Sequence, residues 1–156
     1  YGDWSSDVCS SDLISGDDRE IILKTDGTPR PFIGDPTLLS HAITNVVNNA
    51  LKYSKDCPAP ELSLHFDEEG VVLAVRDFGI GIPEGEKEKL FDTFYRATNV
   101  TNIQGTGMGL VIVKQFIEMH RGTVRLDSEE GKGTVVIINL PYITPVSMDA
   151  PEVTKN

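Results

Sequence analysis

The stretch that decides the fold is VRDFGIGIP at residues 75–83, together with GTGMGL at residues 105–110. Glycine tolerates positive φ angles and lets a ligand approach the backbone closely. The second stretch leads into the apolar run Val111–Ile117, so its glycines stand at a predicted helix start, where free N–H groups attract anions. The two stretches together predict a nucleotide site in which Asp77 meets the base and residues 105–110 meet the phosphates.

Taken alone, the glycines of residues 105–109 indicate an ordinary loop more often than a phosphate-binding turn. Their spacing is wrong for a dinucleotide-binding fingerprint, and no β-strand runs directly into them. The chain also lacks a GxxxxGK[ST] P-loop. Asp77, in turn, could cap a turn at a strand end instead of accepting a hydrogen bond from adenine N6. Residues 45–53 and 91–96 strengthen the nucleotide hypothesis.

An asparagine-rich helix is predicted before the first glycine stretch. The Asp-Pro pair at residues 35–36 is typical of an N-cap and first helical residue, and the helix should extend to about Tyr53. Asn45, Asn49 and Lys52 share one face of it at positions i, i+4 and i+7. Asparagine is only a moderate helix former, but its amide oxygen can ligate Mg²⁺, and the lysine can meet a phosphate. The alternative is a solvated polar face.

Apolar and alternating runs predict five strands, at residues 19–25, 61–66, 71–77, 123–127 and 134–140. Turns at residues 67–70 and 129–133 make two hairpins, and Pro141 should stop the last strand. A short charged helix is predicted over residues 84–90, and the helix after Gly109 should end with Gly122 at its C-cap. The polar residues 97–104 indicate either a mobile lid or a plain loop.

The composition restricts the kind of protein. A chain of 156 residues fits one domain, and a net charge of −10 with a pI near 4.6 argues against nucleic-acid binding. No apolar run approaches the about 18 residues of a membrane span, and no signal peptide is seen. The expectation is a cytoplasmic protein, or the cytoplasmic part of a membrane-anchored one, with no direct membrane contact by this fragment. Cys9 and Cys57 form no CxxC pair. Residues 1–18 are expected to be non-native or linker sequence, and residues 143–156 a disordered tail.

Four motifs occur in a specific order: NVVNNALKYS at 45–54, DFGIG at 77–81, FDTFYR at 91–96 and GTGMGL at 105–110. They resemble the N, first glycine, F and second glycine boxes of the catalytic ATP-binding domain of sensor histidine kinases. The resemblance covers residues 19–142 and extends to the wider GHKL superfamily of DNA gyrase, the Hsp90 chaperones and MutL. It implies an α+β fold, a two-layer sandwich with a mixed sheet of about five strands and helices on one face (the Bergerat fold).

The resemblance also implies which residues would hold Mg²⁺ and ATP. Asn49 would ligate Mg²⁺, while Asn45 and Lys52 would lie at the phosphates, and these three form the implied catalytic set. Asp77 would bind the adenine amine, with Thr134 assisting through a water. The other implied nucleotide contacts are Tyr53 on the nucleoside; Gly79, Gly81 and Ile82 around the adenine; Arg96 on the phosphates; and Gly105, Thr106, Gly107, Met108, Gly109 and Leu110 in the lid hinge.

Two absences bear on the implied chemistry. ATP-hydrolysing relatives carry a glutamate where this chain has Asn45, and an amide cannot act as a general base, so efficient hydrolysis is not expected. The family's phosphoacceptor is a histidine in an H-E-x-x-T/N-P context on a separate helical dimerisation domain, and none of the histidines here has that context. The resemblance therefore implies a protein-histidine kinase of a two-component system, with that domain and a response regulator as partners. A nucleotide-binding regulatory module and an anti-sigma-factor-type serine kinase remain open.

Overall fold

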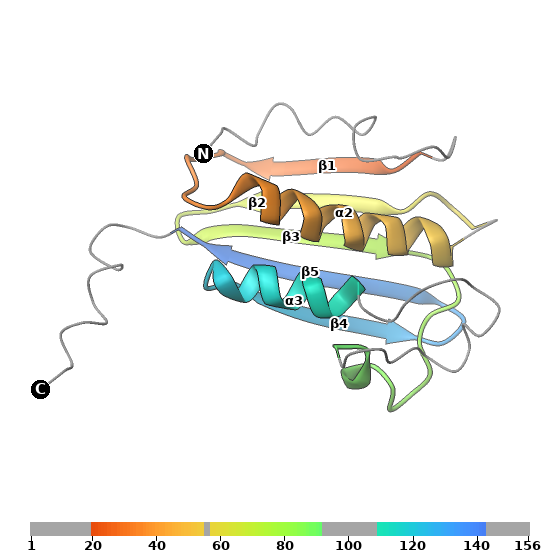
Figure 1. Ribbon diagram of the computed structural model, residues 1–156. Helices are drawn as coiled ribbons and strands as arrows, with labels where there is room; N and C mark the ends of the chain where they lie inside the picture. The colour runs from red at the N-terminus through yellow and green to blue at the C-terminus, as the bar shows by residue number, and fades with distance from the viewer. Residues whose placement is uncertain (1–19, 55–56, 92–108, 143–156) are drawn as a thin grey trace, which may run out of the picture.

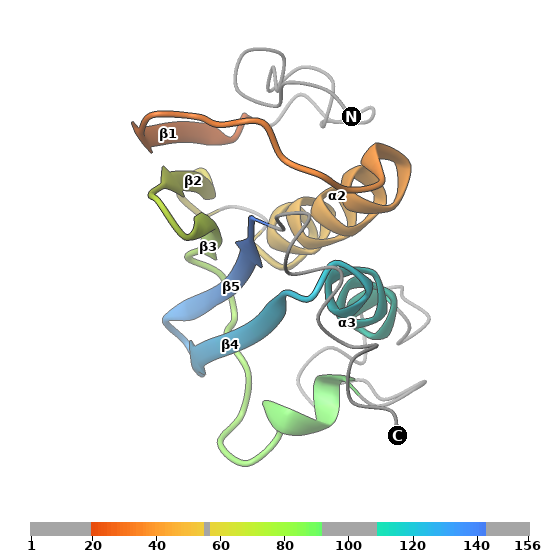
Figure 2. The same cartoon turned by 90° about the vertical axis from the view of Figure 1, so that its left-hand side faces the viewer.

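A five-stranded mixed sheet carries two helices on one face. The computed structural model describes residues 20–54, 57–91 and 109–142. Its elements are β1 (Ile22–Gly27), α2 (Pro36–Tyr53), β2 (Glu61–Phe66), β3 (Gly70–Asp77), the 3₁₀ helix η1 (Glu88–Phe91), α3 (Gly109–Met119), β4 (Thr123–Glu129) and β5 (Gly133–Pro141). The strand order is β1-β2-β3-β5-β4, with β1 parallel to β2 and every other pair antiparallel. Both helices lie on the same side of the sheet (Figures 1 and 2), which confirms the predicted two-layer sandwich.

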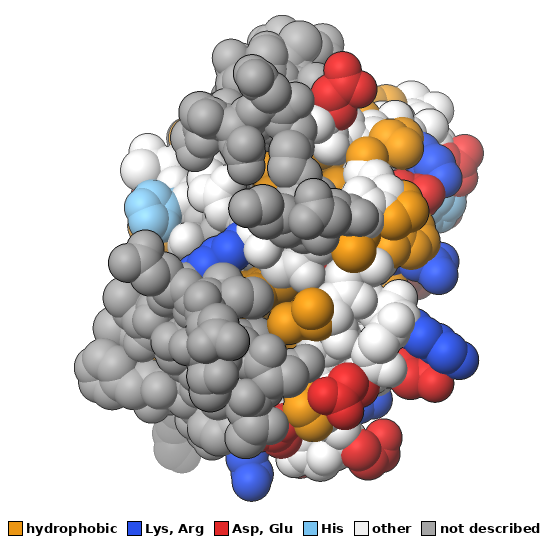
Figure 3. All heavy atoms as spheres, turned by 90° about the vertical axis from the view of Figure 1, so that its right-hand side faces the viewer, with side chains coloured by type: hydrophobic (Ala, Val, Ile, Leu, Met, Phe, Trp, Pro, Cys, Tyr) orange, Lys and Arg blue, Asp and Glu red, His pale blue; other side chains and the backbone are white. Residues whose placement is uncertain are grey.

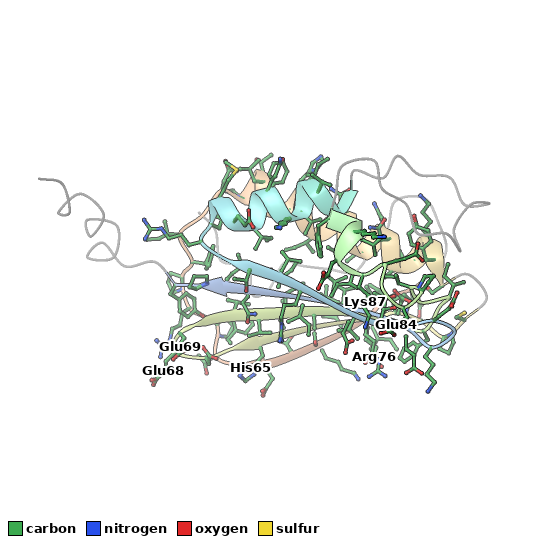
Figure 4. All side chains as sticks on the ribbon, turned by 90° about the horizontal axis from the view of Figure 1, so that it is seen from below. His65, Glu68, Glu69, Arg76, Glu84 and Lys87 are labelled. Carbon is green, nitrogen blue, oxygen red and sulfur yellow. The ribbon has the colours of Figure 1, made fainter. Side chains whose placement is uncertain are left out.

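The core lies between the helices and the sheet. The apolar stripe of α2 recurs at helical spacing, and alternate residues of the central strands face it. His65 and Arg76 lie on the opposite face of the sheet, away from the helices (Figure 4). The buried core consists of Ile21, Leu39, Ala42, Ile43, Val46, Val47, Ala50, Leu51, Leu62, Leu73, Val75, Val113, Ile117, Val136, Ile138 and Leu140.

The start of α2 is fixed by its cap and by a histidine. A carboxylate oxygen of Asp35 accepts from the backbone N–H of Thr37 at 2.9 Å and of Leu38 at 3.3 Å, and Pro36 follows, as predicted. The N–H of Asp35 donates to Nε2 of buried His120 at 2.9 Å, so Nδ1 carries the proton that the Phe116 carbonyl accepts at 2.7 Å. His120 therefore joins the end of α3 to the start of α2 as a neutral structural residue.

Two local predictions are wrong. Residues 84–90 do not form a helix: only Glu88–Phe91 forms a 3₁₀ turn, because the chain bends at Gly85, whose φ is +85°. Gly122 is not the left-handed cap of α3, because that conformation belongs to Arg121, with φ 62°. The N–H of Gly122 donates to the Ile117 carbonyl at 2.9 Å, and a Cβ there would lie 2.4 Å from the Asn139 carbonyl oxygen. Close packing on β5 thus requires this glycine.

The strand boundaries differ slightly from the predicted ones. The parallel ladder of β1 continues to the pair Gly27–Phe66, so β1 runs over residues 22–27 rather than 19–25. The β4–β5 ladder extends to the pair Glu129–Gly133, and β5 keeps Pro141 as its last residue instead of ending before it. Ladder hydrogen bonds with a neighbour, rather than local sequence, set these ends. No helix among the described residues is long and apolar enough to cross a membrane.

Candidate functional site

Those predicted site residues that the structure describes gather at one end of the sandwich. At that end α2 and β3 terminate, α3 begins, and the β4–β5 hairpin turns (Figure 1). Where the described residues form the surface of this end, hydrophobic side chains lie among acidic and basic ones (Figure 3). Segments that are far apart in the sequence therefore meet there.

Asp77 is a buried carboxylate at the end of β3. Among the described residues it is the one Asp, Glu, Lys or Arg that is buried, and it is only 8% exposed. Burial raises the pKa of Asp77, while hydrogen bonds from the backbone N–H groups of Gly79 and Thr134 act in the opposite direction. The contact with the Gly79 N–H is 3.0 Å long, so Asp77 does cap the turn, as the alternative hypothesis proposed. The same group supplies a desolvated hydrogen-bond acceptor at the end of β3.

The first glycine turn is held between α2 and the β4–β5 hairpin. A Cβ on Gly79 would lie 2.1 Å from the Tyr53 carbonyl oxygen, which also accepts from the N–H of Ile80 at 3.3 Å. Gly81 has φ +69°, and a Cβ there would lie 2.1 Å from the Glu129 carbonyl oxygen. Only glycine permits both contacts, so these two residues bring Asp77 and the end of α2 together.

Ile82 and Thr134 lie at the same end as Asp77. Ile82 is buried, with Tyr53, Ile80, Leu90 and Leu126 packed against it. Thr134 stands directly opposite Asp77 in the β3–β5 ladder. The Tyr53 ring and the Thr134 hydroxyl therefore lie at the same end as Asp77.

The N-terminus of α3 lies beside the asparagine face of α2. A Cβ on Gly109, the first residue of α3, would lie 3.7 Å from Nδ2 of Asn49. On the same helix, Nδ2 of Asn45 is buried and has no hydrogen-bond partner in the described part of the chain. Lys52 is exposed, with Nζ 5.3 Å from the centroid of the Tyr53 ring. A helix N-terminus next to amide and ammonium donors is suited to an anion.

Some predicted site residues lie outside the described residues: Arg96, Gly105, Thr106, Gly107 and Met108, together with the lid at residues 97–104. Leu110, which is half-buried, follows Gly109 in α3. The sequence analysis missed Ser128, whose hydroxyl contacts both Ile82 and Thr134. The predicted strand ended at residue 127. Extending it by one residue would have revealed Ser128, because a hairpin that turns at residues 129–133 pairs Ser128 with Thr134.

Comparison with known proteins assigns the class. The model of the family described as histidine kinase-, DNA gyrase B- and HSP90-like ATPases matches residues 34–144. The chain belongs to this family and is an ATP-binding domain of the kind found in sensor histidine kinases, as the four motifs predicted.

Individual relatives agree with this assignment. The chain is 40% identical over 112 residues to the sensor histidine kinase WalK of Bacillus subtilis, a match that covers 69% of this chain and 18% of WalK. It is 34% identical over 146 residues to the sensor-like histidine kinase SenX3 of Mycolicibacterium smegmatis, covering 91% of this chain and 38% of SenX3. The chain therefore spans well under half the length of these relatives.

A solved structure has the same fold. The mycobacterial sensor histidine kinase MprB superposes with a TM-score of 0.63 at 33% identity, over 78% of this chain and 82% of the MprB chain. The order of strands and the single helical layer described above are therefore those of a sensor-kinase ATP-binding domain.

Proposed function

We propose that this chain binds ATP with Mg²⁺ and donates the γ-phosphate to a histidine on a separate helical dimerisation domain. A response regulator would then receive the phosphate, and the domain would act in the cytoplasm. One observation carries the proposal: a Cβ on Gly109 would lie 3.7 Å from Nδ2 of Asn49, so the α3 N-terminus stands beside the asparagine face, at the end where Asp77 is buried.

The residues present fit the nucleotide. Asp77 offers a buried acceptor to an exocyclic amine. Gly79 has no side chain and packs directly on the Tyr53 backbone, so it puts no side chain between the turn and a ligand. The buried Nδ2 of Asn45 is a donor that lacks a partner among the described residues, which suits a phosphate oxygen or its water shell. Binding of ATP would supply that acceptor.

The metal would be held chiefly by the phosphates and by one amide oxygen. Among the described residues no three His, Cys, Asp or Glu side chains cluster as a metal site. Mg²⁺ is commonly bound by one or two protein oxygens together with substrate phosphates, and Asn49 has the right donor atom. When bound, Mg²⁺ would neutralise phosphate charge. Asn49 would orient the metal ion. The α3 N-terminus and Lys52 would stabilise the negative phosphate charge that remains.

The chain's own residues favour transfer over hydrolysis. Asn45 occupies the helical position at which hydrolysing relatives have a glutamate, and it cannot take a proton from water. Phosphoryl transfer needs mainly positioning and charge neutralisation when the acceptor is itself a nucleophile. His120 has both ring nitrogens in hydrogen bonds, while His41 and His65 are exposed away from the site. This supports an acceptor histidine on another domain.

A reconstituted transfer reaction tests the proposal. The chain is mixed with a separately expressed dimerisation domain from a relative such as WalK, and with γ-labelled ATP and Mg²⁺. Acid-labile, base-stable label on that domain is expected, and it should vanish when the acceptor histidine is replaced.

Two other results would contradict the proposal in different ways. ATP binding without any label on the helical domain would favour a regulatory nucleotide-binding module. Acid-stable label on serine of an added protein would favour a serine kinase instead.

A further inference from the structure

The hydroxyl of Ser128 joins three segments around Asp77, at the proposed base-binding end of the site. Ser128 lies in β4 opposite Thr134 in β5, and Thr134 lies opposite Asp77 in β3. The Ser128 Oγ is 2.9 Å from the backbone N of Ile82, 2.8 Å from the carbonyl oxygen of Gly133 and 2.8 Å from Oγ1 of Thr134. One small side chain thus touches the glycine turn, the hairpin and the residue that faces Asp77.

These three distances allow one arrangement of protons. A hydroxyl has one proton to donate and two sites at which to accept. The Gly133 carbonyl cannot donate, so the Ser128 proton must lie in that contact. The Ile82 N–H takes one acceptor site of Ser128, and the Thr134 hydroxyl must donate to the other. Any other arrangement would leave two oxygens at 2.8 Å with no proton between them.

The Thr134 hydroxyl is therefore restricted to accepting from any ligand or water. Its only proton points at Ser128, and the neighbouring Asp77 carboxylate is also an acceptor. Among the described residues, the Thr134 hydroxyl and the Asp77 carboxylate thus both present acceptors to a ligand. An exocyclic amine brings two donors to such a place, whereas a carbonyl oxygen brings none and would face other acceptors.

We propose that Ser128 is a positioning residue that holds the Thr134 hydroxyl as an acceptor beside Asp77, and that this favours a 6-aminopurine over a 6-oxopurine. The inference rests on the proposed binding of ATP and names a residue that discriminates between bases. In the Ser128→Ala variant the Thr134 hydroxyl is released, can turn its proton outward, and can donate to a carbonyl oxygen. The preference for the 6-aminopurine over the 6-oxopurine should then fall. If Ser128 only supported the turn, its loss would weaken the binding of both nucleotides equally.

The test is calorimetric titration of the whole chain with the Mg²⁺ complexes of ATP and of inosine triphosphate, which differ at the 6 position. The Kd for inosine triphosphate divided by the Kd for ATP measures the preference for the 6-amino group. This ratio should fall about 2- to 13-fold in Ser128→Ala, the range for one neutral hydrogen bond. Ser128→Thr, which keeps the hydroxyl, should retain the wild-type ratio. Ser63→Ala is the matched control, because Ser63 is a serine of β2 whose hydroxyl donates to the Ala74 carbonyl of β3 at 3.5 Å.

A double-mutant cycle separates an effect through Thr134 from a general one. Thr134→Val should lower the same ratio, and adding Ser128→Ala to it should change the ratio no further. If Ser128→Ala does not fold, Thr134→Val alone still decides, since an unchanged ratio would overturn the inference.

An equal loss of affinity for both nucleotides in Ser128→Ala would also overturn it, and would make Ser128 a support for the turn only. Failure of the wild-type chain to bind ATP at all would instead overturn the proposed function, and the inference with it.

Discussion

Replacing Asp77 by asparagine should change nucleotide binding and the pH dependence of stability in ways that can be calculated separately. The carboxylate accepts the Gly79 N–H at 3.0 Å and can still accept from an adenine amine. An amide has only one acceptor oxygen, so Asp77→Asn must turn an NH₂ group toward one of these donors. A mispaired buried polar group costs about 1–3 kcal/mol, which corresponds to a rise of about 5- to 150-fold in the Kd for ATP.

The second effect concerns the ligand-free protein. Burial raises the pKa of Asp77 above the ordinary aspartate value of 3.8, so the folded chain holds this proton more tightly than the unfolded chain does. The stability contributed by the protonated carboxyl is fully present below pH 3.8 and is lost as the pH rises through the raised pKa. Asp77→Asn has no such titration. The free energy of unfolding of the variant minus that of the wild type should therefore increase with pH across this window and then become constant.

Titration calorimetry with Mg·ATP at pH 7.5 measures the first effect, and urea unfolding without nucleotide, repeated between about pH 3.5 and pH 7, measures the second. Using the difference between the two proteins removes the contribution of the other carboxylates. An unchanged Kd would show that Asp77 does not contact the nucleotide. A stability difference that is flat or falls with pH would contradict the assigned effect of burial.

Three further substitutions test separate parts of the structure. Gly79→Ala places a Cβ 2.1 Å from the Tyr53 carbonyl oxygen and should cost about 1–3 kcal/mol of stability and most ATP affinity. Gly131→Ala is the comparison: its φ of +85° also strains an alanine and should cost stability, but its Cβ would meet nothing within 4 Å, so ATP affinity should change little. Asn49→Ala should remove the Mg²⁺-dependent part of ATP binding measured by calorimetry, while Asn48→Ala should not, and surviving metal dependence would assign the ligand elsewhere. His120→Ala should lower the free energy of unfolding by about 1–3 kcal/mol in urea because the Asp35 N–H loses its acceptor, whereas exposed His65→Ala should change it little; equal effects would refute the structural role.

The sequence by itself determined the class of fold and the main elements. The Asp-Pro start of α2 and its apolar stripe are local signals, and β2 was predicted with its observed ends, Glu61 and Phe66, because alternation and turn residues mark a strand directly. The four motifs resembled those of sensor-kinase ATP-binding domains, and the family match bears out that assignment. The same local signals failed at residues 84–90, where charge and helix propensity predicted a helix that the bend at Gly85 prevents.

Only the tertiary structure decided how the site is held together. The sequence placed Asp77 before a glycine turn, but burial of its carboxylate depends on β5 and on the turn packing against Tyr53 and Glu129. The proximity of Asn49 to Gly109 and the contact of Ser128 with Thr134 join residues about 60 positions apart in one case and opposite strands of a hairpin in the other. Periodicity reports which face of an element is buried; it carries no information on which distant element covers that face, because that choice is made by packing and by strand pairing.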